Sequence, residues 1–224
     1  MELWHGSASI VRTPALGLCR PTNDYGAGFY CTPSFDMACE WACRTQAEDG
    51  FANRYELETE GLRMLDLLDE RYTVLNWIAI LLEHRTFQPA FPIANEGSAY
   101  LREHFLIDVS AYDLVHGYRA DDSYFSFARA FINNQISVAQ LGCAMHLGKL
   151  GAQTALVSEK AFAAIRFVEV RRAPSSVYFD RRQQRDLKAR EDFRQLRQTL
   201  DIKGLYIRDI VVQGIENDDE RLHL

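Results

Sequence analysis

The chain has 224 residues, of which 47% are hydrophobic and 25% charged, and its formal net charge is −6. This is the composition of a globular protein with a substantial core, and the acidic balance does not indicate attraction of the whole molecule to nucleic acid, although it allows a local basic patch. The five cysteines form no CxxC pair, which argues against a zinc ribbon or a disulfide framework. We expect neither a signal peptide nor a membrane span and therefore predict a cytoplasmic protein.

Short strands and helices follow one another in an irregular order. Runs of aromatic and β-branched residues between turn residues predict strands at 2–7, 28–33, 54–58, 112–118, 152–158, 167–173 and 209–215. Helical spacing of apolar residues predicts helices at 34–48, 73–85, 123–134, 137–150, 159–165 and 181–200. Ser34 and Thr73 are the expected N-caps of the first two helices.

The order of these elements predicts an α+β fold. Strands and helices do not alternate regularly, and no Gly-rich turn joins a strand to a helix as a dinucleotide-binding fold requires. Without repeats or a Pro/Ser-rich linker, residues 1–224 are predicted to form a single domain, with 175–224 as a C-terminal helix–strand extension. Residues 180–200 carry seven Lys/Arg and four Asp/Glu. They predict a solvated amphipathic helix packed on the domain or, alternatively, a docking surface for nucleic acid or a protein partner.

Two short segments near the start combine residue types that suit a nucleotide bearing an amide. His5 can offer a ring nitrogen to a sugar hydroxyl, and Gly6 lets a ligand approach the main chain. Tyr30 offers a flat π surface to a cationic ring such as nicotinamide, and we expect its hydroxyl to matter little. Gly26 and Gly28 keep bulk away from that ring. Taken singly, each segment is also typical of a packed core.

Four blocks in order resemble a bacterial family of unknown function whose members carry HGS, DFGxGFYxT, ADD and Q. The blocks are LWHGS (3–7), DYGAGFYCTPSFDMACEWA (24–42), YDLVHGYRADDSYF (112–125) and GAQTALVSEKAFAAIRF (151–167). The first two also resemble ADP-ribosyltransferases of the poly(ADP-ribose) polymerase and diphtheria-toxin type. This resemblance implies a split antiparallel β-sheet core with surrounding helices, and NAD⁺ as a substrate without a metal.

The resemblance also implies roles for individual residues. It places His5 on the adenosine ribose, the main chain of Gly6 on the nicotinamide carboxamide, and Tyr30 against the nicotinamide ring. Trp41, on the next helix, is the candidate to cover the other face of that ring. The remaining cofactor-binding positions in these blocks are Ser7 and Gly28.

Gln153 is the main departure from the transferase pattern, because the matching strand of those enzymes begins with a glutamate. A glutamine can bind a ribose hydroxyl but cannot act as a general base. Cleavage of the nicotinamide bond depends on positioning and on charge stabilisation, so the resemblance predicts that Gln153→Glu keeps or raises turnover. Asp121 and Asp122 are candidates for the missing base. An equally weighted alternative is that one of these two residues only caps the helix that follows.

The resemblance implies NAD⁺-dependent transfer of ADP-ribose to an unknown macromolecular acceptor, either protein or nucleic acid. The resemblance further implies a bacterial toxin or defence effector with a neutralising, antitoxin-like partner. One alternative is an NAD⁺ glycohydrolase, in which water is the acceptor. Another is a catalytically idle module that binds NAD⁺ or ADP-ribose, since the glutamate is absent. We expect no metal site and no membrane partner.

Overall fold

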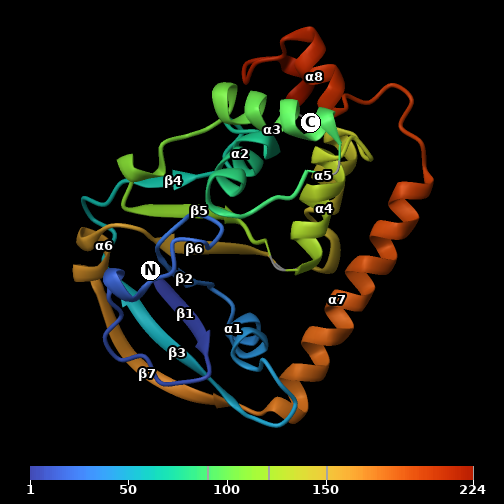
Figure 1. Cartoon of the computed structure of the whole chain (residues 1–224). Helices are drawn as coiled ribbons and strands as arrows, with labels where there is room; N and C mark the ends of the chain where they lie inside the picture. The colour runs from blue at the N-terminus through green and yellow to red at the C-terminus, as the bar shows by residue number, and fades with distance from the viewer. Residues whose placement is uncertain (90, 121, 150, 224) are drawn as a thin grey trace.

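The computed structural model describes residues 1–89, 91–120, 122–149 and 151–223, and it has the mixed α+β architecture that the sequence predicts. Two sheets lie one above the other (Figure 1). The first sheet is antiparallel, in the order β1 (Glu2–Ser7), β3 (Gly50–Leu57), β7 (Ile165–Ala173). The second has the order β2 (Phe29–Cys31), β6 (Ala152–Leu156), β5 (Leu114–Tyr118), β4 (Met64–Asp66).

A backbone bridge at the β1 edge joins the two sheets. The backbone N–H of Trp4 donates to the carbonyl of Thr32 at 2.8 Å, and the N–H of Thr32 donates back at 2.9 Å. Beyond this bridge β1 and β2 diverge, because β1 continues along β3 while β2 continues along β6. The first and second sequence blocks are thereby held side by side at the junction of the sheets.

The expectation of antiparallel pairing throughout is wrong for one strand, because β4 runs parallel to β5. A parallel neighbour requires a crossover connection of a dozen or more residues, usually helical. Here α2 (Val74–His84) and α3 (Pro92–His104) lie between β4 and β5 in the chain and form that crossover. The side chain of Thr73 caps α2 as predicted, accepting from the N–H of Leu75 at 3.3 Å.

The main core surrounds α2, whose residues from Leu75 to Leu82 are all buried. Around it, next to the second sheet, lie α3, α4 (Asp122–Ile132) and α5 (Val138–Ala144) (Figure 1). The helix expected over 137–150 ends at Ala144, and Gly148 has the left-handed φ of 66° in the turn that follows. The short α6 (Glu159–Ala163) connects β6 to β7.

Two helices connect the halves of the molecule. The first, α1 (Phe35–Ala42), is capped by Ser34 as predicted and packs on the first sheet. The second, α7 (Ser175–Gln198), runs from that sheet along one side of the molecule to the helices of the other half (Figure 1). Its first N–H donates to Asp49 at 2.8 Å, and near its end Phe193 stacks on Phe127 with ring centroids 4.1 Å apart. The prediction of a helix packed on the domain is confirmed, but the predicted amphipathic pattern is not, because Leu187 is exposed and Ala189 and Phe193 are the buried apolar residues of α7.

The strand predicted over 209–215 is wrong, because this segment belongs to α8 (Ile207–Gln213). The β-branched residues favour a strand, but the buried Ile207 and Ile210 are three residues apart, which is helical spacing. Gly214 ends the helix with a left-handed φ of 63°. Over the described residues 175–223, the C-terminal extension therefore has α7 and α8 in place of a helix and a strand.

Candidate functional site

A cleft of about 780 Å³ opens where the two sheets diverge. We call it the main cleft. Its described lining comes from β1, β2, β6 and α1, from the loops that follow β1, β5, α1 and α2, and from Arg182 of α7. The structure brings together here the sequence-predicted residues His5, Gly6, Gly28, Tyr30, Trp41 and Gln153.

Ser7 is not among the described residues that line the main cleft. Its hydroxyl donates to the carbonyl of Ser9 and accepts from the side-chain amide of Asn53 at 3.2 Å, which fixes the turn after β1. Asp121 lies outside the described residues, and Asp122 is the first residue of α4.

His5 presents one defined nitrogen to a ligand. Its Nδ1 lies 2.8 Å from the carbonyl oxygen of Tyr30. A carbonyl only accepts, so Nδ1 carries the proton and Nε2 of the neutral ring is an acceptor. Burial lowers the pKa of His5 below its ordinary value of 6.5, although the bond to Tyr30 opposes that shift. The ring also packs on Phe29 at 4.3 Å between centroids. His5 can therefore accept a hydrogen bond from a ligand hydroxyl at neutral pH.

Gly6 lacks a side chain for a reason that the sequence did not indicate. A Cβ at this position would lie 1.9 Å from the carbonyl oxygen of Ala38, so the glycine allows α1 to pack on β1. The main chain of Gly6 still faces the main cleft. Trp4 directs its N–H and C=O away from β3 to Thr32, and strand alternation directs those of Gly6, two residues later, to the same side.

The hydroxyl of Tyr30 makes two hydrogen bonds to the backbone of the turn at Tyr25 and Gly26. It donates to the carbonyl of Gly26 and accepts from the N–H of Tyr25, both at 2.8 Å. Burial raises the pKa of Tyr30 well above its usual range. A Cβ at Gly28 would lie 2.9 Å from the carbonyl oxygen of Leu156 and, at an ordinary contact distance, 3.5 Å from the Tyr30 ring, so the neighbouring strand and not the ring requires this glycine. The hydroxyl therefore has a structural role in this turn, while the expectation that it matters little for turnover stays a prediction.

Gln153 is paired with a carboxylate that sequence reasoning missed. Its Nε2 donates to Oδ2 of Asp24 at 2.9 Å and to the carbonyl of Tyr118 at 3.3 Å. Both amide protons are thereby used, so Oε1 is the atom that can accept from a ligand. Gln153 is 3% exposed and Asp24 is 7% exposed. The amide thus fixes one oxygen of a buried acid at the lining of the main cleft.

Asp24 is held by groups from two further parts of the chain. Its Oδ2 accepts from the N–H of Ala120 at 2.9 Å, and Arg85 approaches Oδ1 at 3.5 Å. Burial raises the pKa of Asp24 above 3.8, while the bonds from Ala120 and Gln153 and the charge of Arg85 oppose the rise. The sequence did offer one indication of Asp24, because this residue begins the block DYGAGFY, directly before a tyrosine and a glycine.

The main cleft is positively charged in a chain whose net charge is −6. Asp24 is the single carboxylate among the described residues that line it. Five arginines share that lining: Arg20, Arg44, Arg85, Arg119 and Arg182. Guanidinium groups bind phosphate through paired N–H donors. The charge of the main cleft therefore suits an anionic, phosphate-bearing ligand.

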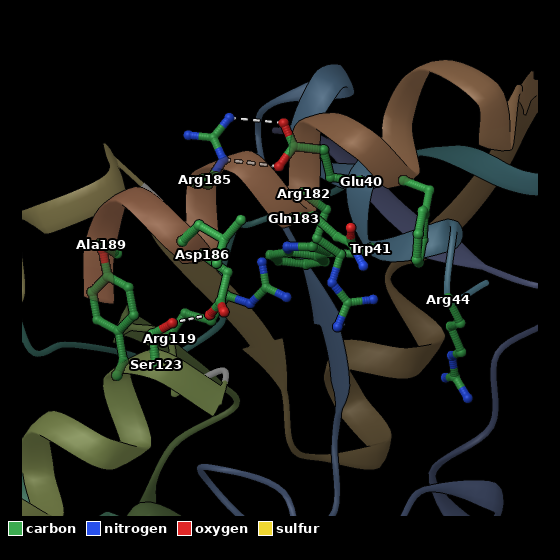
Figure 2. A pocket seen from close by; sticks show the side chains of 13 residues that line it. Glu40, Trp41, Arg44, Arg119, Ser123, Arg182, Gln183, Arg185, Asp186 and Ala189 are labelled. Atoms are coloured by element: carbon green, nitrogen blue, oxygen red, sulfur yellow. Dashed lines mark hydrogen bonds and ion pairs between the residues drawn. The ribbon is translucent and has the colours of Figure 1, made fainter. Parts of the chain in front are cut away.

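A second cavity of about 450 Å³ adjoins the main cleft. The two share Trp41, Arg44, Arg119 and Arg182, so Trp41 stands in their common wall (Figure 2). The Arg119 guanidinium lies 3.9 Å from the centroid of the Trp41 ring and covers one of its faces. The indole Nε1 of Trp41 is buried and has no hydrogen-bond partner within the described part of the chain.

A buried ion pair closes the far side of the second cavity. Arg185 of α7 holds both carboxylate oxygens of Glu40 of α1, at 2.7 and 2.8 Å (Figure 2). It also donates to the carbonyl of Gly148 at 2.7 Å. Glu40 is 2% exposed, so this bidentate pair fixes α7 against α1.

The described residues contain no group of three or more His, Cys, Asp and Glu side chains placed to hold a metal ion. Among the helices in the described ranges, none combines the length and the apolar character that crossing a bilayer requires.

Comparison with known proteins gives one match. Residues 1–167 match a family model described as protein of unknown function (DUF3990). Neither the curated proteins nor the solved structures contain a match to the chain. Of the described residues that line the main cleft, all but Arg182 lie within the matched segment. The second cavity also depends on α7, which begins after that segment.

Proposed function

Since the chain belongs to the DUF3990 family, whose function is unknown, we propose its activity from the main cleft: it binds NAD⁺ and transfers the ADP-ribose group to an acceptor. The observation that carries the proposal is the convergence in one cleft of His5, Tyr30 and the Asp24–Gln153 pair with five arginines. These residues lie far apart in the chain. Together they would bind a ribose, a planar cation, the reacting centre and a pyrophosphate.

Each part of NAD⁺ would have a defined partner in the main cleft. A ribose hydroxyl would donate to Nε2 of His5, the ring nitrogen left as an acceptor. The carboxamide would bind the outward N–H and C=O of Gly6, and the nicotinamide ring would stack on Tyr30. The pyrophosphate would bind the arginines, of which Arg85 and Arg182 come from opposite halves of the molecule.

The reaction would break the bond between C1′ of the ribose and the nicotinamide nitrogen, whose ring takes the electron pair and becomes neutral. Positive charge then develops on the ribose, and Oε1 of Gln153 would hold its hydroxyl in place. The carboxylate of Asp24 would stabilise that charge. As the acceptor forms its bond to C1′, Asp24 would take the proton that the acceptor loses. Gln153 would act as a positioning residue for both groups.

Two alternatives share the same NAD⁺ site. With water as acceptor the chain would be an NAD⁺ glycohydrolase. Without turnover it would be a module that binds NAD⁺ or ADP-ribose, an interpretation favoured by the absence of a carboxylate at Gln153. The buried carboxylate of Asp24, 2.9 Å from Gln153, supports catalysis over that idle module.

Radiolabelled NAD⁺ separates the three functions. We expect nicotinamide release by the purified chain and transfer of adenylate label to a macromolecule in bacterial lysate, with Asp24→Asn inactive and the exposed Asp218→Asn as the matched control. Release without transferred label would establish the glycohydrolase. Calorimetric binding without release would establish the idle module, and an absence of both binding and release would overturn the NAD⁺ site.

A toxin or defence effector, as the resemblance implies, would act inside a bacterial host. Expression of the wild-type chain is then expected to arrest growth, whereas Asp24→Asn is not. Normal growth with the active wild-type chain at equal expression would contradict the toxin role. An arrested culture also provides the assay in which a neutralising partner would be selected.

A further inference from the structure

A third hollow continues the second cavity along α7. This groove, of about 490 Å³, lies between α4 and α7. Leu187 lines both the groove and the second cavity, which in turn shares Trp41 with the main cleft. The three hollows therefore adjoin one another through shared lining residues, and we call them together the track. Within the described residues, the charged side chains that line the groove are Arg129, Arg190, Arg194 and Arg197.

The track is basic although acidic residues outnumber basic ones in the chain, 31 to 25. Among the described residues that line the three hollows there are ten arginines and three carboxylates, Asp24, Glu40 and Asp186. No lysine is among them within the described ranges. Arginine has the geometry to hold a phosphate with two N–H donors, and such a row matches an anion that is extended over several phosphates.

Some of these arginines already have acidic neighbours. Arg185 is committed to the buried Glu40 and contributes to the structure of the wall. Arg190 and Arg194 pair with Asp186 and Glu191 on the exposed surface of the same helix. Exposed pairs within a helix contribute little to stability, so a phosphate can replace the carboxylate at small cost.

Trp41 supplies an aromatic plane beside this row of charges. Arg119 covers one face, and the buried Nε1 lacks an acceptor within the described part of the chain. A nucleic-acid base can stack on the face of an indole. An acidic peptide would match the charge without using the ring. A duplex keeps its bases stacked inside, so a single strand uses both features.

The division of the chain agrees with a separate acceptor site. The main cleft comes almost entirely from the family-matched segment, whereas α7 forms one side of the second cavity and of the groove. We therefore propose that a single-stranded nucleic acid binds along the α4–α7 groove and the second cavity, and presents one nucleotide at Trp41 to the main cleft as the acceptor. Its role as acceptor rests on the proposed transferase function, whereas its binding does not.

Fluorescence anisotropy tests the binding without NAD⁺. The probes are labelled 12-nucleotide oligouridylate, oligothymidylate and a duplex of the same length, each measured at several salt concentrations. The test variant is Arg194→Glu/Arg197→Glu. The matched control is Arg181→Glu/Lys188→Glu, two exposed residues of the same helix that line none of the three hollows within the described residues. Both variants change the charge of α7 equally.

We expect the wild-type chain to bind a single strand more tightly than the duplex. The groove variant is expected to lose at least tenfold in affinity and the control less than threefold. The slope of log K against log salt should become less negative by about 1.4 in the groove variant, because each phosphate contact to a single strand contributes about 0.7. A preference between the uridylate and thymidylate probes distinguishes RNA from DNA.

Circular dichroism checks that each variant is folded, and the glutamine versions of both pairs replace any that is not. No binding of either single strand at low salt, or equal losses in the groove and control variants, would overturn the proposal. Nicotinamide release by the wild-type chain is measured separately. Release without strand binding would overturn only the nucleic-acid acceptor, whereas strand binding without NAD⁺ binding or release would overturn only the proposed function.

Discussion

The side-chain amide of Gln153 and the carboxylate of Asp24 form one unit, with Nε2 2.9 Å from Oδ2. The resemblance to ADP-ribosyltransferases predicts an acid at the position of Gln153, and the structure has an acid beside it instead. A titratable group thus lines the main cleft although the strand residue itself does not titrate. The effects that we expect of substitutions at Asp24 and Gln153 follow from this pair.

Asp24→Asn should abolish most nicotinamide release, by about 10²- to 10⁴-fold, which is the usual contribution of a general base. The amide keeps the shape and can still accept from Ala120, so the fold should survive. Since burial raises the pKa of Asp24 above 3.8, the wild-type rate should fall as the pH decreases through that raised value. Rates of wild type and Asp218→Asn against pH should both show this limb. An identical limb in Asp24→Asn would assign it to another group.

Gln153→Glu should lose both stability and turnover, in contrast to the expectation from the sequence. The new carboxylate would face Asp24 and the carbonyl of Tyr118, where the amide now donates. Two carboxylates at this distance share a proton, so the pKa of the pair is raised in the folded chain. The folded state then binds more protons than the unfolded state, and its stability falls as the pH rises. Urea unfolding at pH 5 and pH 8 should show a larger deficit at pH 8, and a variant as stable as wild type at pH 8 would refute this.

Tyr30→Phe should destabilise the chain by about 1 to 3 kcal/mol, because the N–H of Tyr25 and the carbonyl of Gly26 both lose their partner. The control is Tyr178→Phe, whose hydroxyl lies at the surface, 3.2 Å from Asp36. Its effect should stay below about 0.5 kcal/mol. Urea unfolding measures both. Equal effects of the two substitutions would mean that the hydrogen bonds of Tyr30 do not hold the turn.

His5 should make the stability of the chain depend on pH on the acidic side. Its pKa is lowered by burial, so below pH 6.5 the unfolded chain takes up a proton that the folded chain does not. The free energy of unfolding therefore falls with decreasing pH, until the folded ring also becomes protonated. The contribution of a single group is at most about 1.4 kcal/mol per pH unit. His5→Gln should flatten the curve measured between pH 7.5 and 5.5, and parallel curves would contradict the shift.

Arg185→Ala should cost about 3 to 5 kcal/mol, because it leaves the buried carboxylate of Glu40 without its partner. Glu40→Gln/Arg185→Met should recover much of this loss by removing both charges. Lys188→Ala breaks only the exposed pair with Asp192 and should change stability by less than about 1 kcal/mol. Hydrogen exchange should quicken along α7 in Arg185→Ala but not in Lys188→Ala. Similar exchange in both would mean that the pair does not anchor α7.

The sequence by itself determined the local structure near strong signals. Ser34 and Thr73 cap α1 and α2 as predicted, because an N-cap bonds to an N–H only two or three residues later. The sequence was ambiguous at 209–215, because its β-branched residues favour a strand whereas the spacing of its apolar residues is helical. The α+β class also followed from the order of the elements, while the parallel pairing of β4 did not, since it depends on where α2 and α3 carry the chain.

Only the tertiary structure decided what the site residues do. Gln153 lies 129 positions from Asp24, and no local pattern relates an amide to so distant a carboxylate. Gly6 is a glycine because α1 packs against it, and Trp41 meets Arg119 because α1 lies beside the end of β5. Caps and periodicity depend on neighbours within one helical turn, whereas burial, charge pairing and the shape of a cleft arise where distant segments pack. That is why the sequence could name six residues of the main cleft but not the carboxylate of Asp24 that lies among them.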